Sequence, residues 1–185
     1  MHRRGLLRVA TAGVLGALLP GQADASVSRA LRLEQLVGRS RHVVLGEPLD
    51  GYSVWETIGD RRHIVSYTRV RTHELLAGAD PEHEEILVRT LGGRVGKLGE
   101  LVPGEARLQL GSRGVLFTML SGETLTVTAM AQGHYPLRRD GTSVEWLQRS
   151  PEAMDLVGED GSAVRQLSGL RIAEARTLLR QVRPQ

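Results

Sequence analysis

Hydrophobic and polar residues alternate through much of the middle of the chain, a pattern that is typical of β-strands with one buried and one solvent-facing side. The longest such stretch is residues 62–76 (RHIVSYTRVRTHELL), in which Ile64, Thr68, Val70 and Thr72 share one parity. Shorter stretches rich in aliphatic or β-branched residues predict further strands at 42–49, 84–91, 113–120, 123–133 and 134–147.

Two dipeptides predict tight turns between these strands. Ser121-Gly122 separates the strand predicted at 113–120 from the one predicted at 123–133, so the two are expected to form a hairpin. Asp140-Gly141 is the strongest two-residue turn signal in the chain, and it divides the last predicted strand into two short arms.

Helical spacing of apolar residues occurs on either side of the predicted strands. Residues 26–40 (SVSRALRLEQLVGRS) place most of their apolar side chains on one stripe, and Ser28 is the predicted N-cap. Residues 168–182 (SGLRIAEARTLLRQV) repeat this spacing, and Pro184 follows them. The acidic and polar stretch 148–161 predicts a loop or a short helix.

The predicted order is therefore one helix, five or six strands and a second helix. Several short strands with turns between them favour a small β-barrel or sandwich over a parallel sheet with crossover helices. We expect a mainly β domain over residues 26–147, with residues 148–185 forming a polar loop and a C-terminal helix that packs on the barrel.

Residues 1–25 have the features of an export signal. A basic start (MHRRGLLR) is followed by an apolar run of eleven residues (VATAGVLGALL) and by a small-x-small cleavage site (ADA) before Ser26. At ~1.5 Å per residue this run is too short to cross a hydrocarbon core of ~30 Å. Arg3-Arg4 resembles a twin-arginine motif, and a general secretory signal is the alternative. We expect the mature protein in the periplasm or outside the cell, without a transmembrane anchor.

Removal of this signal changes the charge balance. The full chain has a formal net charge of +3, but three arginines and one aspartate lie in residues 1–25, which leaves 21 basic and 20 acidic side chains. A nucleic-acid partner requires a dense basic face and stacking aromatics, whereas aromatic residues make up 3% of this chain. The chain has no cysteine, which excludes disulfides, thiolate metal sites and cysteine nucleophiles.

The glycine-rich stretch 90–100 (TLGGRVGKLGE) resembles a phosphate-binding loop only in part. A P-loop requires Ser or Thr after the Gly-Lys pair, but Leu98 follows Lys97, and the proline-containing sequence ELVPGE stands where a Rossmann fold would begin a helix. We therefore interpret the stretch as a curved connection in a β-domain. The residues expected to form a partner-binding loop are Gly92, Gly93, Arg94, Gly96 and Lys97.

A second partial motif lies at residues 73–83 (HELLAGADPEH), which match the zinc pattern HExxHxxGxxH at His73, Glu74 and His83. Ala77 replaces the middle histidine, and hydrolytic zinc requires three protein ligands. The paired histidines of this motif also require a helix, whereas this stretch continues a predicted strand. Coincidence is the favoured interpretation, and no metal or other cofactor is expected.

Several short glycine-centred patterns occur together in a family of exported bacterial proteins of unknown function, which this chain resembles. The similarity covers about residues 33–137 and the closing helix, and its motifs lie at residues 43–46, 68–78, 92–96, 111–120 and 132–135. The arrangement is also similar to the OB-type barrel of netrin-like modules and tissue inhibitors of metalloproteinases. The resemblance implies a small antiparallel OB-like barrel of five to six strands, flanked by an N-terminal and a C-terminal helix. The zinc chelation by which those inhibitors act requires an N-terminal cysteine, so it does not carry over.

No complete set of catalytic residues is visible in the sequence, so no catalytic residue is assigned. The leading hypothesis is an exported, non-catalytic binding domain that acts on another envelope or secreted protein, such as a protease. The alternatives are a metal-dependent hydrolase or other enzyme with a site assembled from scattered residues, and a purely structural component of the envelope.

Overall fold

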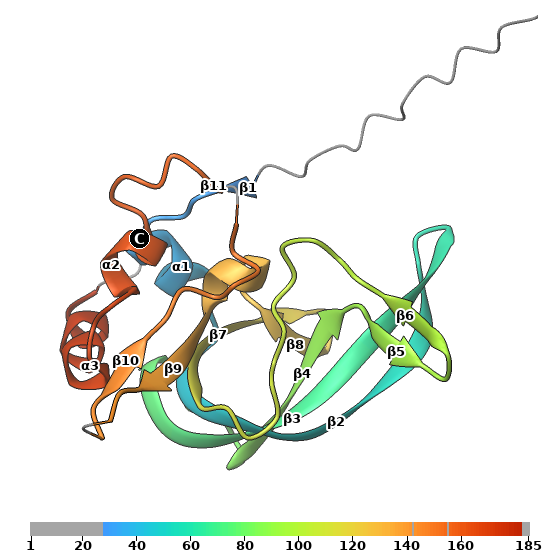
Figure 1. Cartoon of the computed structure of the whole chain (residues 1–185), viewed down its shortest axis with the longest axis horizontal. Helices are drawn as coiled ribbons and strands as arrows, with labels where there is room; N and C mark the ends of the chain where they lie inside the picture. Colours follow the sequence, from blue (N-terminus) through green and yellow to red (C-terminus); the bar gives the residue numbers. More distant parts are fainter. Residues whose placement is uncertain (1–27, 142, 155, 183–185) are drawn as a thin grey trace, which may run out of the picture.

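The protein is mainly β, with helices gathered at one end of the molecule (Figure 1). The computed structural model describes residues 28–141, 143–154 and 156–182. The strands are β1 (Ser28–Arg29), β2 (His42–Ile58), β3 (Arg61–Gly78), β4 (Glu85–Leu91), β5 (Gly93–Val95), β6 (Leu98–Glu100), β7 (Gly114–Ser121), β8 (Thr124–Val127), β9 (His134–Arg139), β10 (Glu145–Leu147) and β11 (Leu156–Val157). The helices are α1 (Leu33–Arg39), the 3-10 helix η1 (Met130–Gly133), α2 (Ala163–Leu167) and α3 (Ile172–Gln181).

Seven strands form the main sheet in the order β10-β9-β7-β2-β3-β4-β8. Strand β8 pairs both with β4 and with β7, so the pairings β7–β2–β3–β4–β8–β7 form a cycle. The β4–β8 pairing is parallel and the others in this sheet are antiparallel. The mainly β prediction is confirmed, while the sheet has more strands than expected and is not wholly antiparallel.

Strand β2 is longer than the sequence predicts. Gly46 and Pro48 favour an early end, yet the strand continues to Ile58, with register shifts between Val43 and Val44, between Leu45 and Gly46, and between Pro48 and Asp50. Pairing with β7 stops at Gly46, so Pro48 lies where β2 has a strand on one side only, and its missing N–H removes no ladder hydrogen bond on the other side. The bulges bend the β2–β3 hairpin so that it projects from the sheet (Figure 1).

Two groups of buried side chains stabilise the fold by removing aliphatic surface from water. One lies within the cycle of strands and consists of Val44, Val70, Ile86, Val88, Ala106, Leu116 and Val127. The other joins the three α-helices to strands β2, β7, β9 and β10, and its largest members include Leu33, Leu36, Phe117, Tyr135, Leu147, Leu167 and Leu179. Phe117 and Tyr135 pack edge to face in this second group, with ring centroids 5.8 Å apart.

The helical predictions need correction at their boundaries. Ser28 lies in β1, and α1 begins at Leu33, where the Arg32 N–H donates to the Gln35 side chain (3.1 Å). The C-terminal stretch contains two helices because α2 precedes α3, and within 148–161 the chain forms β11, which pairs with β1. The predicted export signal, residues 1–25, lies outside the described residues. No helix in the described ranges is long and apolar enough to span a membrane.

The predicted β7–β8 hairpin is confirmed, because Ser121 pairs with Thr124 across a two-residue loop. Strand β8 is shorter than expected: Ala129 and Met130 have φ of 54° and 57°, and this left-handed backbone ends the strand before η1. At Asp140-Gly141 the strands also form a hairpin, but the last pair is Arg139 with Glu145, so the connection is longer than the predicted two-residue turn.

Candidate functional site

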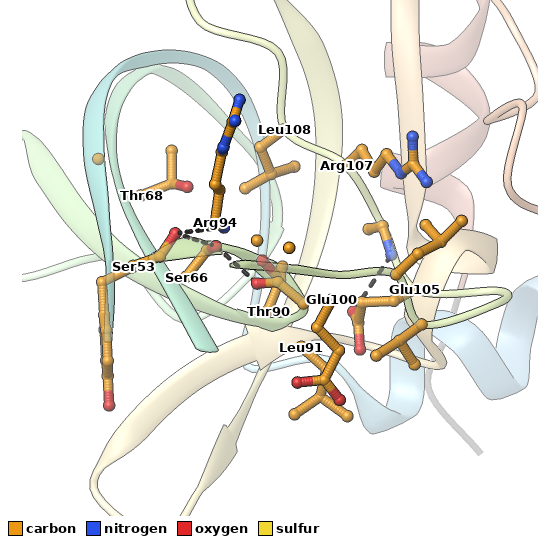
Figure 2. Close-up of a pocket in the computed structure, with 18 of the residues that line it drawn as sticks. Ser53, Ser66, Thr68, Thr90, Leu91, Arg94, Glu100, Glu105, Arg107 and Leu108 are labelled. Atoms are coloured by element: carbon orange, nitrogen blue, oxygen red, sulfur yellow. Dashed lines mark hydrogen bonds between the residues drawn. The ribbon is translucent and has the colours of Figure 1, made fainter. Parts of the chain in front are cut away.

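An open cleft of about 860 Å³ lies beside the projecting β2–β3 hairpin. Strand β4, the β5–β6 hairpin and the following segment 101–110 form its other walls, and Figure 2 shows 18 of the residues that line it. Four of the five residues of the predicted partner-binding loop line this cleft: Gly92, Gly93, Arg94 and Lys97. Gly96 lies at the tip of the β5–β6 hairpin, outside the lining.

The glycine-rich stretch is a two-stranded hairpin, in which Val95 pairs with Leu98 across Gly96 and Lys97. Gly93 has a φ of +135°, which favours glycine, and it packs directly on the β2–β3 hairpin. A Cβ at Gly93 would overlap the Ser66 hydroxyl and would lie 2.6 Å from the Ser53 hydroxyl. This close approach explains the glycine on packing grounds and requires no bound phosphate.

Hydrogen bonds hold the β5–β6 hairpin against the sheet. The Ser66 hydroxyl donates to the Gly92 carbonyl (2.7 Å) and lies 2.9 Å from the Ser53 hydroxyl, which accepts from the Arg94 N–H (3.4 Å). Figure 2 shows Ser53, Ser66 and Arg94 close together. The Ser53 and Ser66 hydroxyls therefore already have hydrogen-bond partners within the fold.

Glu100, at the end of β6, is a second link between the hairpin and β3. Its carboxylate lies 2.7 Å from His63 Nδ1 and accepts a hydrogen bond from the Ile64 N–H (2.5 Å). The His63 hydrogen bond, followed by the Ile64 N–H, lowers the pKa of Glu100. Because Glu100 already has these partners, its carboxylate is not a free group of the cleft.

Three polar groups in the cleft wall have different surroundings. Thr68 and Thr90 are each 7% exposed, and neither hydroxyl has a hydrogen-bond partner among the described residues. Glu105 is 8% exposed, and one of its carboxylate oxygens accepts from the Ala106 N–H (3.2 Å). Burial raises the pKa of Glu105, against the smaller opposing effects of the Ala106 and Leu91 amides.

The rim of the cleft carries positive charge. Arg94 and Lys97 are exposed, and neither forms an ion pair within the described part of the chain. Arg94 Nε donates to the Gly96 carbonyl (3.2 Å), which directs the guanidinium along the hairpin. Arg107 lies on the opposite wall, 3.6 Å from a carboxylate oxygen of Glu152, and its side chain is 59% exposed.

The three residues of the partial zinc motif do not form a site together. His73 Nε2 lies 3.0 Å from Glu47 of β2, whereas Glu74 accepts two hydrogen bonds from Arg176 of α3, both 2.7 Å. His83 is exposed in the connection between β3 and β4. Across the described ranges, no group of three histidine, aspartate or glutamate side chains is placed to hold a metal ion.

A second polar cluster lies in a smaller cleft of about 550 Å³, which shares Arg107 and Leu108 with the first. His134 Nδ1 lies 3.4 Å from the Ser150 hydroxyl, and that hydroxyl donates to Glu152 (2.8 Å). Ser150 is 1% exposed, so its hydroxyl is closed to a substrate. Burial lowers the pKa of His134 to about 4, so the ring is neutral at pH 7 and its basicity is weak.

Sequence patterns do not identify Thr68, Thr90 or Glu105 as site residues. The two threonines look like ordinary members of strand faces, and Glu105 lies in an irregular segment. They come together because β3 and β4 pair with Ser66 opposite Thr90, which puts Thr68 and Thr90 on the same side of the sheet. No motif with a fixed residue spacing indicates such a pairing of strands.

Neither protein-family models nor curated protein sequences gave a match to this chain.

Proposed function

We propose that the mature protein is an exported, non-catalytic binding domain that engages another envelope or secreted protein through the cleft beside the β2–β3 hairpin. The observation that carries this proposal is the cleft itself, about 860 Å³ in volume and walled on one side by the glycine hairpin. Ligand sites in proteins are commonly concavities of ~300–1,000 Å³ with a few polar groups among apolar ones.

We also propose that the five strands in the cycle of pairings form an OB-like barrel. The cycle β7–β2–β3–β4–β8–β7, with its parallel β4–β8 pair, supports this proposal. OB-folds are partly open five-stranded barrels that bind ligands on the face of their second and third strands. Here those strands are β3 and β4, which contribute Ser66, Thr68 and Thr90 to the cleft. This support is an analogy between folds, and it agrees with the resemblance to netrin-like modules.

The chemistry of the cleft favours binding over hydrolysis. Glu100 is held by His63 and Ile64. The Ser53 and Ser66 hydroxyls bond to each other and to the backbone of the β5–β6 hairpin, so neither is placed against a general base. A protein partner also fits the nearly neutral charge of residues 26–185 better than a nucleic acid does, because nucleic acids require many phosphate contacts.

Affinity capture with cleft variants tests this function. Immobilised mature protein is incubated with periplasmic and culture-medium extracts of the source cells, and retained proteins are identified by mass spectrometry. Leu101 lines the cleft and Met154 does not, while both are 66% exposed, so Leu101→Glu and Met154→Glu are a matched pair. We expect one partner to be retained by the wild type and by Met154→Glu and to be lost with Leu101→Glu. Retention of the same proteins by all three would contradict the proposal.

A further inference from the structure

We infer that the cleft binds an extended peptide segment in which an aliphatic side chain lies next to a carboxylate. This inference rests on the proposed function and adds the chemistry of the partner. Three independent features of the cleft lead to it: hydroxyls without protein partners, an aliphatic wall and an excess of positive charge at the rim.

The first feature is the pair of threonines on the sheet. A hydroxyl that opens onto a cleft can exchange its bound water for a hydrogen-bonding group of a ligand. Thr68 and Thr90 are each 7% exposed, and the described residues supply no partner for either hydroxyl. Neither hydroxyl oxygen is among the fully buried unpaired atoms, so both are open to the cleft. Both line the cleft, and Figure 2 shows them on its sheet side. Peptide N–H and C=O groups of an extended segment are suitable partners for two hydroxyls on one face of the sheet.

The second feature is the apolar surface that adjoins these hydroxyls. Leu91, Val102 and Leu108 line the cleft, and Leu108 also packs against the buried group inside the cycle of strands. Leu101 and Leu110 extend this surface to the rim, where they are 66% and 56% exposed. Burying a ligand's aliphatic side chain here would remove apolar surface of both molecules from water.

The third feature is the charge at the rim. Arg94 and Lys97 have no ion-pair partner among the described residues, whereas the two carboxylates that line the cleft are engaged elsewhere or buried. The remaining charge on the open side is therefore positive. Such a surface attracts a carboxylate, and an arginine can hold it with two parallel hydrogen bonds.

A peptide fits these features better than a saccharide of the envelope does. Tyr52 and Tyr67 line the cleft, but their rings stack on each other, with centroids 5.4 Å apart. An aliphatic wall next to a cationic rim matches a segment that combines leucine-like and acidic residues. Binding of an acidic saccharide instead is an outcome of the experiment below.

Selection from a random library tests this chemistry even while the cellular partner is unidentified. Random hexapeptides displayed on phage are selected on the immobilised mature protein, and the affinity of the most enriched peptide is measured by fluorescence anisotropy. The double variant R94E/K97E reverses the rim charge, and R39E/R165E, on the exposed surfaces of α1 and α2, changes the net charge by the same amount. An oligomer of uronic acid is added as a competitor.

We expect the enriched peptides to pair Asp or Glu with Leu, Ile or Val. We expect R94E/K97E to weaken their binding at least tenfold and R39E/R165E to change it less than threefold. In T68V/T90V, which removes both hydroxyls at nearly constant volume, the urea midpoint should stay the same or rise while affinity falls roughly threefold to tenfold per hydroxyl.

Three results would overturn the inference: a basic or aromatic consensus, no enrichment over the R94E/K97E variant, or displacement of the peptide by the uronic acid oligomer at similar concentration. The proposed function and the inferred ligand chemistry can fail separately. If Leu101→Glu abolishes capture of a cellular partner but acidic, aliphatic peptides do not compete with that partner, then the cleft is the binding site and the inferred ligand chemistry is wrong.

Discussion

Replacement of Gly93 by alanine should separate the β5–β6 hairpin from the sheet. The backbone at Gly93 has φ of +135°, a region that L-residues rarely adopt, and strain of this kind costs about 1–3 kcal/mol. The added Cβ would also overlap the Ser66 hydroxyl and crowd Ser53, and overpacking typically costs about 1–3 kcal/mol. Together these effects predict a loss of about 4 kcal/mol in the free energy of unfolding.

Gly96 provides the matched control in the same hairpin. Its φ is also positive, at +61°, but a Cβ there has no atom within 4 Å. Gly96→Ala therefore carries backbone strain alone, about 1–2 kcal/mol. The difference between the two variants isolates the contact of the hairpin with Ser53 and Ser66 from the general preference for glycine at positive φ.

Urea unfolding of the mature protein measures both variants, with circular dichroism and tryptophan fluorescence as probes. We expect Gly93→Ala to lower the unfolding midpoint markedly and Gly96→Ala to lower it slightly. We also expect Gly93→Ala to weaken partner capture, because the displaced hairpin forms one wall of the cleft. Equal destabilisation by the two variants would refute the reasoning, since the packing contact would then contribute nothing.

Three further predictions concern the charged groups. Glu74→Gln should lower the free energy of unfolding by about 1 kcal/mol at pH 7, because the partly exposed ion pair with Arg176 is lost. Arg176 lowers the pKa of Glu74, so the difference between wild type and variant should vanish only in acid, where Glu74 becomes protonated. Urea denaturation of both proteins at pH 7 and in acid checks this. Burial lowers the pKa of His134 to about 4, so the unfolded chain binds a proton there more readily than the folded protein does. The free energy of unfolding should therefore fall as pH drops from 6.5 to about 4, by roughly 3 kcal/mol at most. His134→Gln should flatten that part of the pH profile. Glu105, whose pKa burial raises, binds its proton more tightly in the folded state, so stability should decline as pH rises above 4.5; Glu105→Gln should remove this decline and raise the melting temperature at pH 7.

Local patterns predict the strands well where one side of each strand faces the interior. The alternation around Thr68 and Val70 identifies β3 because every second side chain there is buried, and Ser121-Gly122 identifies the β7–β8 turn because a two-residue loop leaves few alternatives. The prediction fails where tertiary context overrides local signals. Pro48 is a local signal for the end of a strand, but at the unpaired side of β2 its missing N–H removes no hydrogen bond.

The candidate site, like the strands, is predicted by local sequence patterns only in part. The glycines at 92 and 93 stand out in the sequence because positive φ and close packing leave few other residues suitable, and they do line the cleft. Thr68, Thr90 and Glu105 come from two strands and a loop, and only the β3–β4 register and the path of the 101–110 segment bring them together. Their burial and the surroundings of their polar groups are properties of the folded chain, and no spacing in the sequence encodes them.

Site-specific photo-crosslinking in living cells tests the central claim most directly. A benzophenone amino acid is introduced at position 101, in the cleft, or at position 154, outside it; both native side chains are 66% exposed, so the probes have similar access to solvent. Irradiation should yield a discrete crosslinked species with a second exported protein from position 101 and none from position 154. Crosslinks of the same kind from both positions, or from position 154 alone, would contradict the assignment of the cleft as the binding site.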